Sequence, residues 1–451
     1  MTYEDENESV ADDEVGETNA NEAPKMRWLY VLAIGLGFFT TGVSWSVYNS
    51  YLPADFLPAF ISGDFENTII GAIMVLDNIL ALFLQPYIGA RSDKTRTRWG
   101  RRMPYILIGT PIAAIYFSLI AYGWAASMFW VMFGMITVFN VAMAFYRAPV
   151  VALMPDLVPS EHRSKANGVI NLMGGIGAIY AYAVASQIYK IRDTNLASIF
   201  HVQIWQIGPV LAFVTTSLIM IIAVIVLFLV IKETDSPKRE EEEEQEEIGI
   251  LEAMRQVSFS DDKSAIAILG AIFFWFLGYN AIETWFTKYG KEVLGFATAD
   301  ASFLLNGIAL AFVIFAVPAG FIAGRIGRKK TILGGLVIML AALVALWVVS
   351  DYYTILGILV VAGVGWAMVN VNSIVIVWQL LGQKRLGAGT GLYYFASMSA
   401  AIFGPFATGV IFDITSITLM YPVSIAFFVV ALILTLAIRT GEVGDQAIGA
   451  S

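Results

Sequence analysis

The chain of 451 residues is 58% hydrophobic and 14% charged, whereas a soluble protein carries about 25% charged residues. It contains no cysteine and only two histidines, which excludes disulfides, thiolate metal sites and thiol catalysis. The net charge of −9 comes from acidic stretches at the start and in the middle of the chain, and the remainder is cationic, as expected for a surface that faces anionic lipid.

Apolar runs of about 20 residues, the length that crosses a hydrocarbon core as a helix, alternate with short polar segments along the chain. Strands of a membrane barrel would be shorter and would alternate polar with apolar residues, a pattern that is absent here. The sequence therefore predicts an all-α integral membrane protein with twelve transmembrane helices. We place them at Val31–Leu52, Thr68–Ala90, Pro104–Ala125, Met128–Leu153, Gly168–Tyr189, Gln206–Ile231, Ser264–Thr287, Ala301–Ala323, Thr331–Val349, Tyr353–Leu381, Gly387–Ile411 and Leu419–Ile438.

A Glu-rich segment between the sixth and seventh predicted helices divides the chain into two halves. We interpret it and the acidic N-terminal segment as solvated and disordered. The expected organisation is a tail at 1–25, a first six-helix half at 26–231, a linker at 232–263, a second six-helix half at 264–438 and a tail at 439–451.

Lys and Arg residues gather in the segments that follow even-numbered helices. Together with the two termini, these segments hold 22 basic residues, against 4 in the segments after odd-numbered helices. Because basic loops stay on the cytoplasmic side, we expect both termini in the cytoplasm and a multi-pass protein of the cytoplasmic (plasma) membrane.

A basic turn recurs at equivalent places in the two halves. Residues 89–102 read GARSDKTRTRWGRR after the second helix, and residues 320–330 read GFIAGRIGRKK after the eighth. Gly89 and Gly320 are expected to let helices approach closely. Asp93 is expected to pair with the arginines, or with a helix N-terminus in the other half, and so to hold a gate shut in one state. The predicted gate residues are Gly89, Asp93, Arg98, Gly100, Arg101, Arg102, Gly320, Arg325, Gly327 and Arg328.

Several of these motifs resemble the sucrose/maltose-type sugar–proton symporters of the major facilitator superfamily and, more distantly, the melibiose-type glycoside permeases. The resemblance rests on Gln85-Pro86, Gly89, Ser92-Asp93-Lys94, Arg98-Trp99-Gly100-Arg101-Arg102, Tyr146-Arg147-Ala148-Pro149, Asp156, Gly365-Trp366-Ala367 and the segment from Gly391. It implies the major facilitator fold, with two six-helix pseudo-repeats around a midplane site, and proton-driven uptake of a disaccharide or related glucoside.

Three ionisable residues, Asp77, Arg147 and Glu283, lie inside the apolar runs. Such residues are costly in hydrocarbon and are expected to face the bundle interior, as structural pairs or as functional groups. Polar and aromatic residues share helix faces with them, and such faces suit the hydroxyls and C–H faces of a sugar. The predicted substrate-binding residues are Trp45, Tyr48, Asn49, Asn140, Tyr146, Arg147, Tyr279, Asn280, Glu283, Asn370, Asn372 and Tyr394, although Asn372 is rotated away from the Asn370 face.

The resemblance also marks two departures. Asn140 stands where the sucrose carriers have an acid tied to proton coupling. Ala81, Gln85 and Arg147 stand where the melibiose-type permeases have the acids that bind sodium. We therefore expect an internal Asp77–Arg147 ion pair in place of a cation site, with Asp77, or alternatively Glu283, as the group that protonates.

The primary hypothesis is thus a sugar–proton symporter rather than an enzyme, because the carboxylates lack any metal-ligating or nucleophile–base constellation. We expect a monomer in lipid that binds sugar and protons, with no cofactor, no metal and no nucleic acid. Two alternatives remain: an efflux carrier for amphipathic compounds on the same fold, and a non-transporting sugar sensor.

Overall fold

The computed structural model describes residues 27–159, 162–233, 263–381 and 386–439. These residues form twelve helices that are long and apolar enough to cross a membrane. The predicted all-α membrane fold is therefore confirmed. The acidic tail and all but the ends of the Glu-rich linker lie outside the described residues.

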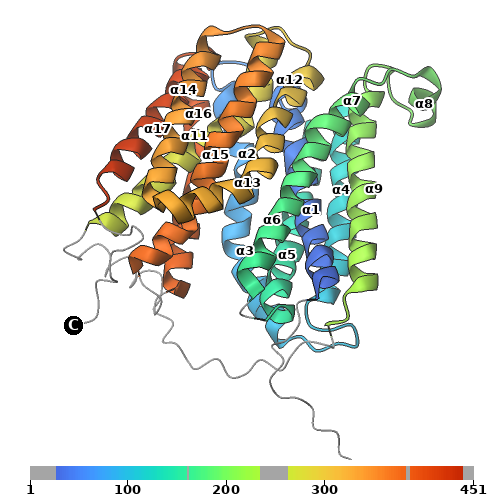
Figure 1. The fold of residues 1–451 in the computed structure, drawn as a ribbon. Helices are drawn as coiled ribbons and strands as arrows, with labels where there is room; N and C mark the ends of the chain where they lie inside the picture. The colour runs from blue at the N-terminus through green and yellow to red at the C-terminus, as the bar shows by residue number, and fades with distance from the viewer. Residues whose placement is uncertain (1–26, 160–161, 234–262, 382–385, 440–451) are drawn as a thin grey trace, which may run out of the picture.

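The first half contains the first six crossings, several of which are interrupted (Figure 1). Two of the interruptions are π-helical turns, and the second crossing breaks at Val75. The elements are α1 (Trp28–Tyr51) with η1 (Leu52–Phe56), α2 (Glu66–Met74) with α3 (Leu76–Lys94), α4 (Met103–Ala125), α5 (Phe129–Leu157), α6 (Arg163–Ile179) with η3 (Tyr180–Ala185) and α7 (Ser186–Tyr189), the short α8 (Thr194–Ile199), and α9 (Ile207–Val230).

The second half contains the other six crossings. Its elements are α11 (Ser264–Glu292), α12 (Thr298–Leu304) with α13 (Asn306–Ile326), α14 (Arg328–Val348), α15 (Tyr352–Leu381), α16 (Leu386–Ile414), and η6 (Ile417–Leu419) with α17 (Met420–Leu436). Most helices extend a few residues past the predicted runs, because their polar ends continue the backbone hydrogen bonding beyond the apolar segment.

Glycines determine how closely the helices pack within the first half. A Cβ added to Gly42 of α1 would lie 2.1 Å from the carbonyl oxygen of Gly174 in α6. Without side chains at these positions the two backbones touch. This contact fixes the first and fifth crossings against each other, and the fifth contributes to the central cavity described below.

The two halves meet mainly at one end of the bundle. We call the end with residues 89–102 and 320–330 the motif end, at the bottom of Figure 1, and the opposite end the far end. Near the far end α2 packs against α16, where a Cβ on Gly71 would meet the carbonyl oxygen of Pro405 at 2.6 Å. A Cβ on Gly409 would meet the carbonyl oxygen of Asn67 at 2.4 Å. The halves are thus in backbone contact there.

Candidate functional site

A cavity of about 160 Å³ lies between the two halves. The first half contributes part of the fifth crossing, and the second half contributes α11, the α12–α13 crossing and α15. The lining residues are Gly175, Ala178, Tyr182, Tyr279, Ile282, Glu283, Leu305, Ile308, Ala309, Phe312 and Trp366. Glu283 is the single carboxylate in this otherwise aromatic and aliphatic lining.

An aromatic platform forms one wall of the cavity. The rings of Tyr279 and Trp366 stack with centroids 4.0 Å apart and planes 5° from parallel. Phe276 packs edge-on against Trp366 at 5.4 Å. Because Trp366 is held on one face by Tyr279 and at its edge by Phe276, the platform is rigid, and a rigid flat surface suits the C–H face of a sugar ring.

Glu283 is surrounded by polar groups from both halves. Asn49 of α1 lies within hydrogen-bond reach of the Glu283 carboxylate, and the hydroxyl-bearing rings of Tyr182 and Tyr279 lie close enough to interact with its charge. The structure thus brings together three residues that the sequence singled out: Asn49, Tyr279 and Glu283. A carboxylate in such surroundings can accept hydrogen bonds from sugar hydroxyls or hold a proton.

Sequence reasoning missed Tyr182 and Trp366. Tyr182 lies in the π-helical turn η3, whose wider spacing breaks the 3.6-residue periodicity by which we searched for polar faces. Trp366 is part of the Gly365-Trp366-Ala367 similarity, but tryptophans in membrane helices are most often read as interface anchors.

A second polar cluster is buried within the first half. The rings of Trp45, Tyr48 and Phe139 pack together with centroids 5.4 to 5.8 Å apart, and Tyr48 lies beside Asn140. The indole N–H of Trp45, the Tyr48 hydroxyl and both polar atoms of the Asn140 amide complete no hydrogen bond of normal geometry in the described part of the chain. Unsatisfied buried groups are costly, and these atoms keep unused capacity to donate and accept hydrogen bonds.

Asp77 and Arg147 interact electrostatically, but they are not in direct contact. The Asp77 carboxylate instead accepts a hydrogen bond of 2.9 Å from the neighbouring Asn78, and no ion pair between Asp77 and Arg147 occurs in the described part of the chain. The predicted direct ion pair is therefore not formed in this conformation. Glu283 also acts on Asp77 electrostatically, so the two candidate proton carriers influence one another.

The remaining predicted binding residues have local partners. Tyr146 is fully buried and its hydroxyl lies 3.2 Å from that of Thr40, while the Asn280 amide donates to the carbonyl of Phe276. Tyr394 is half exposed. The backbone carbonyl of Asn370 accepts from Ser373. Both amide atoms of Asn372 are hydrogen-bonded, its oxygen to Arg328 at 2.7 Å, which places Asn372 in the motif rather than in the cavity lining.

At the motif end, Arg102 joins three segments of the first half. Its guanidinium pairs with Asp93 and with the hydroxyl of Ser92 in α3, and its Nε donates to Asp156 of α5 at 2.9 Å. Arg101 also reaches Asp156, at 2.9 Å. Asp93 is thus paired with an arginine of its own motif, one of the two predicted arrangements, and Arg102 holds the ends of α3, α4 and α5 together.

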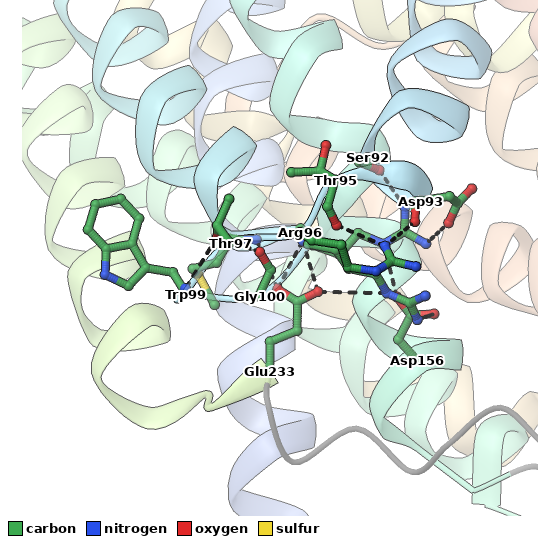
Figure 2. Close-up of polar contacts among 12 residues, drawn as sticks. Ser92, Asp93, Thr95, Arg96, Thr97, Trp99, Gly100, Asp156 and Glu233 are labelled. Carbon is green, nitrogen blue, oxygen red and sulfur yellow. Dashed lines mark hydrogen bonds and ion pairs between the residues drawn. The ribbon is translucent and has the colours of Figure 1, made fainter.

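Glu233, just beyond α9, completes this network (Figure 2). Its carboxylate is buried and accepts from the backbone N–H groups of Arg102 at 2.8 and 2.9 Å and of Met103 at 3.1 Å, which are unpaired donors at the start of α4. Gly100 turns with φ +105° beside it. The sequence pointed to neither acid as a gate residue: Asp156 entered only through the resemblance, and Glu233 was assigned to the linker.

In the second half, Gly327 (φ +99°) makes the turn between α13 and α14. A Cβ built on Gly89 or Gly320 would meet nothing within 4 Å, so the close helix approach expected at these glycines is wrong for this conformation. The reason is that the halves pack at the far end, which leaves the Cβ positions of these two glycines open at the motif end.

Polar contacts at the far end join the two halves directly. Lys288 of α11 binds Glu66 at 2.6 Å, and Asp413 of α16 accepts from the backbone N–H of Thr68 at 2.7 Å. More exposed pairs surround them, namely Lys291 with Asp55 at 2.6 Å and Lys190 with Asp300 at 2.5 Å. The two halves are therefore joined at the far end by residues that the sequence analysis did not select.

Solved structures with the same fold include a bacterial homologue of the human lysosomal transporter Spinster, in an inward-facing and unoccupied conformation, with a TM-score of 0.72 and 15% identity over 93% of this chain and 99% of that one. A D-xylose–proton symporter gives a TM-score of 0.68 and 16% identity over 92% and 98% of the two chains. These similarities confirm the major facilitator fold.

Among curated proteins, the membrane-associated transporter protein of Homo sapiens is 27% identical over 194 residues, 40% of this chain and 35% of that protein. The sucrose transport protein SUC4 of Arabidopsis thaliana is 30% identical over 154 residues, 27% of this chain and 30% of that protein. The chain thus spans about a third of the length of these two relatives. The isoprimeverose transporter of Lactiplantibacillus pentosus is 21% identical over 71% of this chain and 64% of its own length.

These relatives are transporters, which agrees with the expectation of a carrier rather than an enzyme. A family model described as MFS/sugar transport protein matches residues 33–382, which include ten of the twelve crossings. The chain therefore belongs to the MFS/sugar transport protein family.

Proposed function

We propose that this protein is a secondary active transporter that takes up a disaccharide or related glucoside together with a proton. The observation that carries the proposal is the cavity between the halves, where Glu283 lies beside the Tyr279–Trp366 platform and within reach of Asn49. A sugar needs an apolar surface for its ring and charged or amide groups for its hydroxyls. The names of the relatives, a sucrose transport protein, an isoprimeverose transporter, a lactose permease and a general alpha-glucoside permease, support this substrate class.

Proton coupling is assigned to the acids that face the interior. Asp77 and Glu283 act on one another electrostatically, and Arg147 also acts on Asp77. Protonation of one acid therefore changes the field at the other and at the sugar site, which is what coupling requires. If neither acid exchanges a proton during transport, the protein is a facilitator.

We further propose that the motif end faces the cytoplasm, as the distribution of basic residues indicates, and that the protein acts as a monomer in the plasma membrane. The structure then represents an inward-facing state, because the halves are joined at the far end. Transport would follow from rocking of the halves about the cavity.

Counterflow of labelled sugars into proteoliposomes tests the proposal. The purified protein is first screened for thermal stabilisation by a panel of neutral disaccharides, glucosides and amphipathic drugs, because a true ligand stabilises by mass action. Symport predicts sugar counterflow and sugar-driven proton movement. Counterflow of drugs alone would favour an efflux carrier, and sugar binding without counterflow would favour a sensor.

A further inference from the structure

The far-end contact between α2 and α16 is a helix cap supplied by the opposite half. The N-cap residue of α2, Phe65, makes no side-chain capping bond. Asp413, in the last turn of α16, fills this role: it accepts from the backbone N–H groups of Asn67 at 3.0 Å and Thr68 at 2.7 Å, and from the Asn67 amide at 2.9 Å. A carboxylate at a helix N-terminus is stabilised by free N–H donors and by the helix dipole.

A buried lysine reinforces the cap. Lys288 of α11 is 1% exposed, and its ammonium group contacts the carboxylate of Glu66 at 2.6 Å and the side-chain oxygen of Asn67 at 2.7 Å. Both partners belong to the first turn of α2. When the halves separate, Lys288 loses Glu66 and Asn67 and keeps only Glu292 of its own helix, at 3.7 Å. The lost contacts of this buried charge must then be replaced by water.

The same pair of crossings carries a carboxylate at its other end. Asp93 lies in the last turn of α3, at the motif end, and Asp413 lies in the last turn of α16, at the far end. In this conformation Asp413 caps α2, whereas Asp93 pairs with Arg102 in its own half.

We propose that Asp413 and Lys288 form a far-end latch that stabilises the state seen here, and that Asp93 is its opposing counterpart, so that transport alternates between the two carboxylates. This proposal concerns the balance between conformations and depends on neither the sugar nor the proton of the proposed function.

The absence of cysteine permits a direct test. The variant Ala178→Cys places one thiol in the cavity lining, and labelling with a membrane-impermeant maleimide is measured separately from each side of vesicles of known orientation. In this background Asp413→Asn should raise labelling from the far end about tenfold, the effect of weakening a charge-assisted hydrogen bond, and lower it from the motif end. Asp93→Asn should shift labelling in the opposite direction, and the double variant should lie between.

Asp351 provides a matched control. It also caps a helix, accepting from the backbone N–H of Thr354 at 2.8 Å, but both residues belong to the second half. Asp351→Asn should therefore leave labelling unchanged.

Lys288→Gln removes the second part of the latch and should also raise labelling from the far end. It serves as the test if Asp413→Asn does not fold. Unchanged far-end labelling in folded Asp413→Asn and Lys288→Gln, or an equal change in Asp351→Asn, would overturn the proposal. If the variants show the predicted labelling shifts but the wild type shows no sugar counterflow, the result would count against the proposed function and not against the latch.

Discussion

Glu233 lies so close to Gly100 that a Cβ added to residue 100 would meet the Glu233 Oε2 atom at 2.2 Å. Glycine is required at this position for two reasons: a side chain would clash with Glu233, and the φ of +105° is unfavourable for residues with side chains. Together these features hold the end of α9 against the start of α4, so the turn does more than carry positive charge.

We expect Gly100→Ala to destabilise the protein by about 1–3 kcal/mol, because the added methyl group displaces Glu233 from the α4 amides and strains the backbone. The measurement is thermal unfolding in detergent. Gly89→Ala is the control: its Cβ would meet nothing within 4 Å, and its unfolding temperature should match that of the wild type.

The pair of glycines also tests the alternating gate. If Gly89 becomes a close-contact position when the motif end shuts, Gly89→Ala should slow sugar counterflow although the unfolding temperature is unchanged. Wild-type counterflow in this variant would show that the sequence-based expectation of close packing at Gly89 fails in both states.

Trp366→Ala should weaken sugar binding at least tenfold while the protein remains inserted, because Tyr279 then loses the ring on which it stacks. Binding is measured by thermal stabilisation with the sugar that the ligand panel identifies. Trp130→Ala is the control, since Trp130 is 78% exposed on the outside of the bundle. If both variants weaken sugar binding equally, the Tyr279–Trp366 platform is not part of the sugar-binding site.

The fold follows from the sequence because apolar length alone identifies a membrane helix. The expected six-plus-six division follows from the Glu-rich segment between the sixth and seventh predicted helices. Side-chain partners across the halves could not be obtained in this way. Lys288 and Asp413 lie near the polar ends of predicted helices. Charged residues are common at such ends, so the sequence gives no sign of a special contact there. Only the packing of α2 against α16 shows that Asp413 faces free N–H groups rather than water.

Pairing inside the helices was also only partly predictable. Helical spacing placed Tyr279 and Glu283 on one face, and both residues line the cavity. Helical spacing could not show that Asn372 of α15 would accept a hydrogen bond from Arg328. Contacts between the ends of different helices depend on the tertiary arrangement, and the spacing of residues along one helix does not predict that arrangement.

Asp93→Asn should leave folding and sugar binding close to normal but impair transport, because it weakens one conformational state rather than the site. Asp93 is half exposed, and Arg102 keeps its second carboxylate, Asp156, so the expected loss of stability is small. The measurements are unfolding temperature, sugar binding and counterflow on the same preparation. Transport at the wild-type rate would reduce the motif to a membrane anchor.

The last prediction concerns coupling, where the sequence departs most from the proteins that it resembles. Asp77→Asn should abolish sugar-driven proton uptake, and Arg147→Gln should be similarly damaging, because each leaves an interior charge without its electrostatic partner. Since Asp77 and Arg147 interact without direct contact, we expect the double variant to be milder than the sum of the single variants by only about 0.5–3 kcal/mol in stability and sugar binding.

Proton movement is followed with a pH electrode on liposomes that carry each variant, and sodium jumps are applied to the same preparations. Sodium should have no effect, because Ala81, Gln85 and Arg147 offer no carboxylate to a cation. Proton uptake that persists in Asp77→Asn but disappears in Glu283→Gln would assign coupling to the carboxylate in the cavity, directly beside Asn49 and the aromatic platform. Sodium-stimulated sugar uptake by the wild type would instead contradict the replacement of the cation site by Arg147, because a cation would then have to bind where the guanidinium lies.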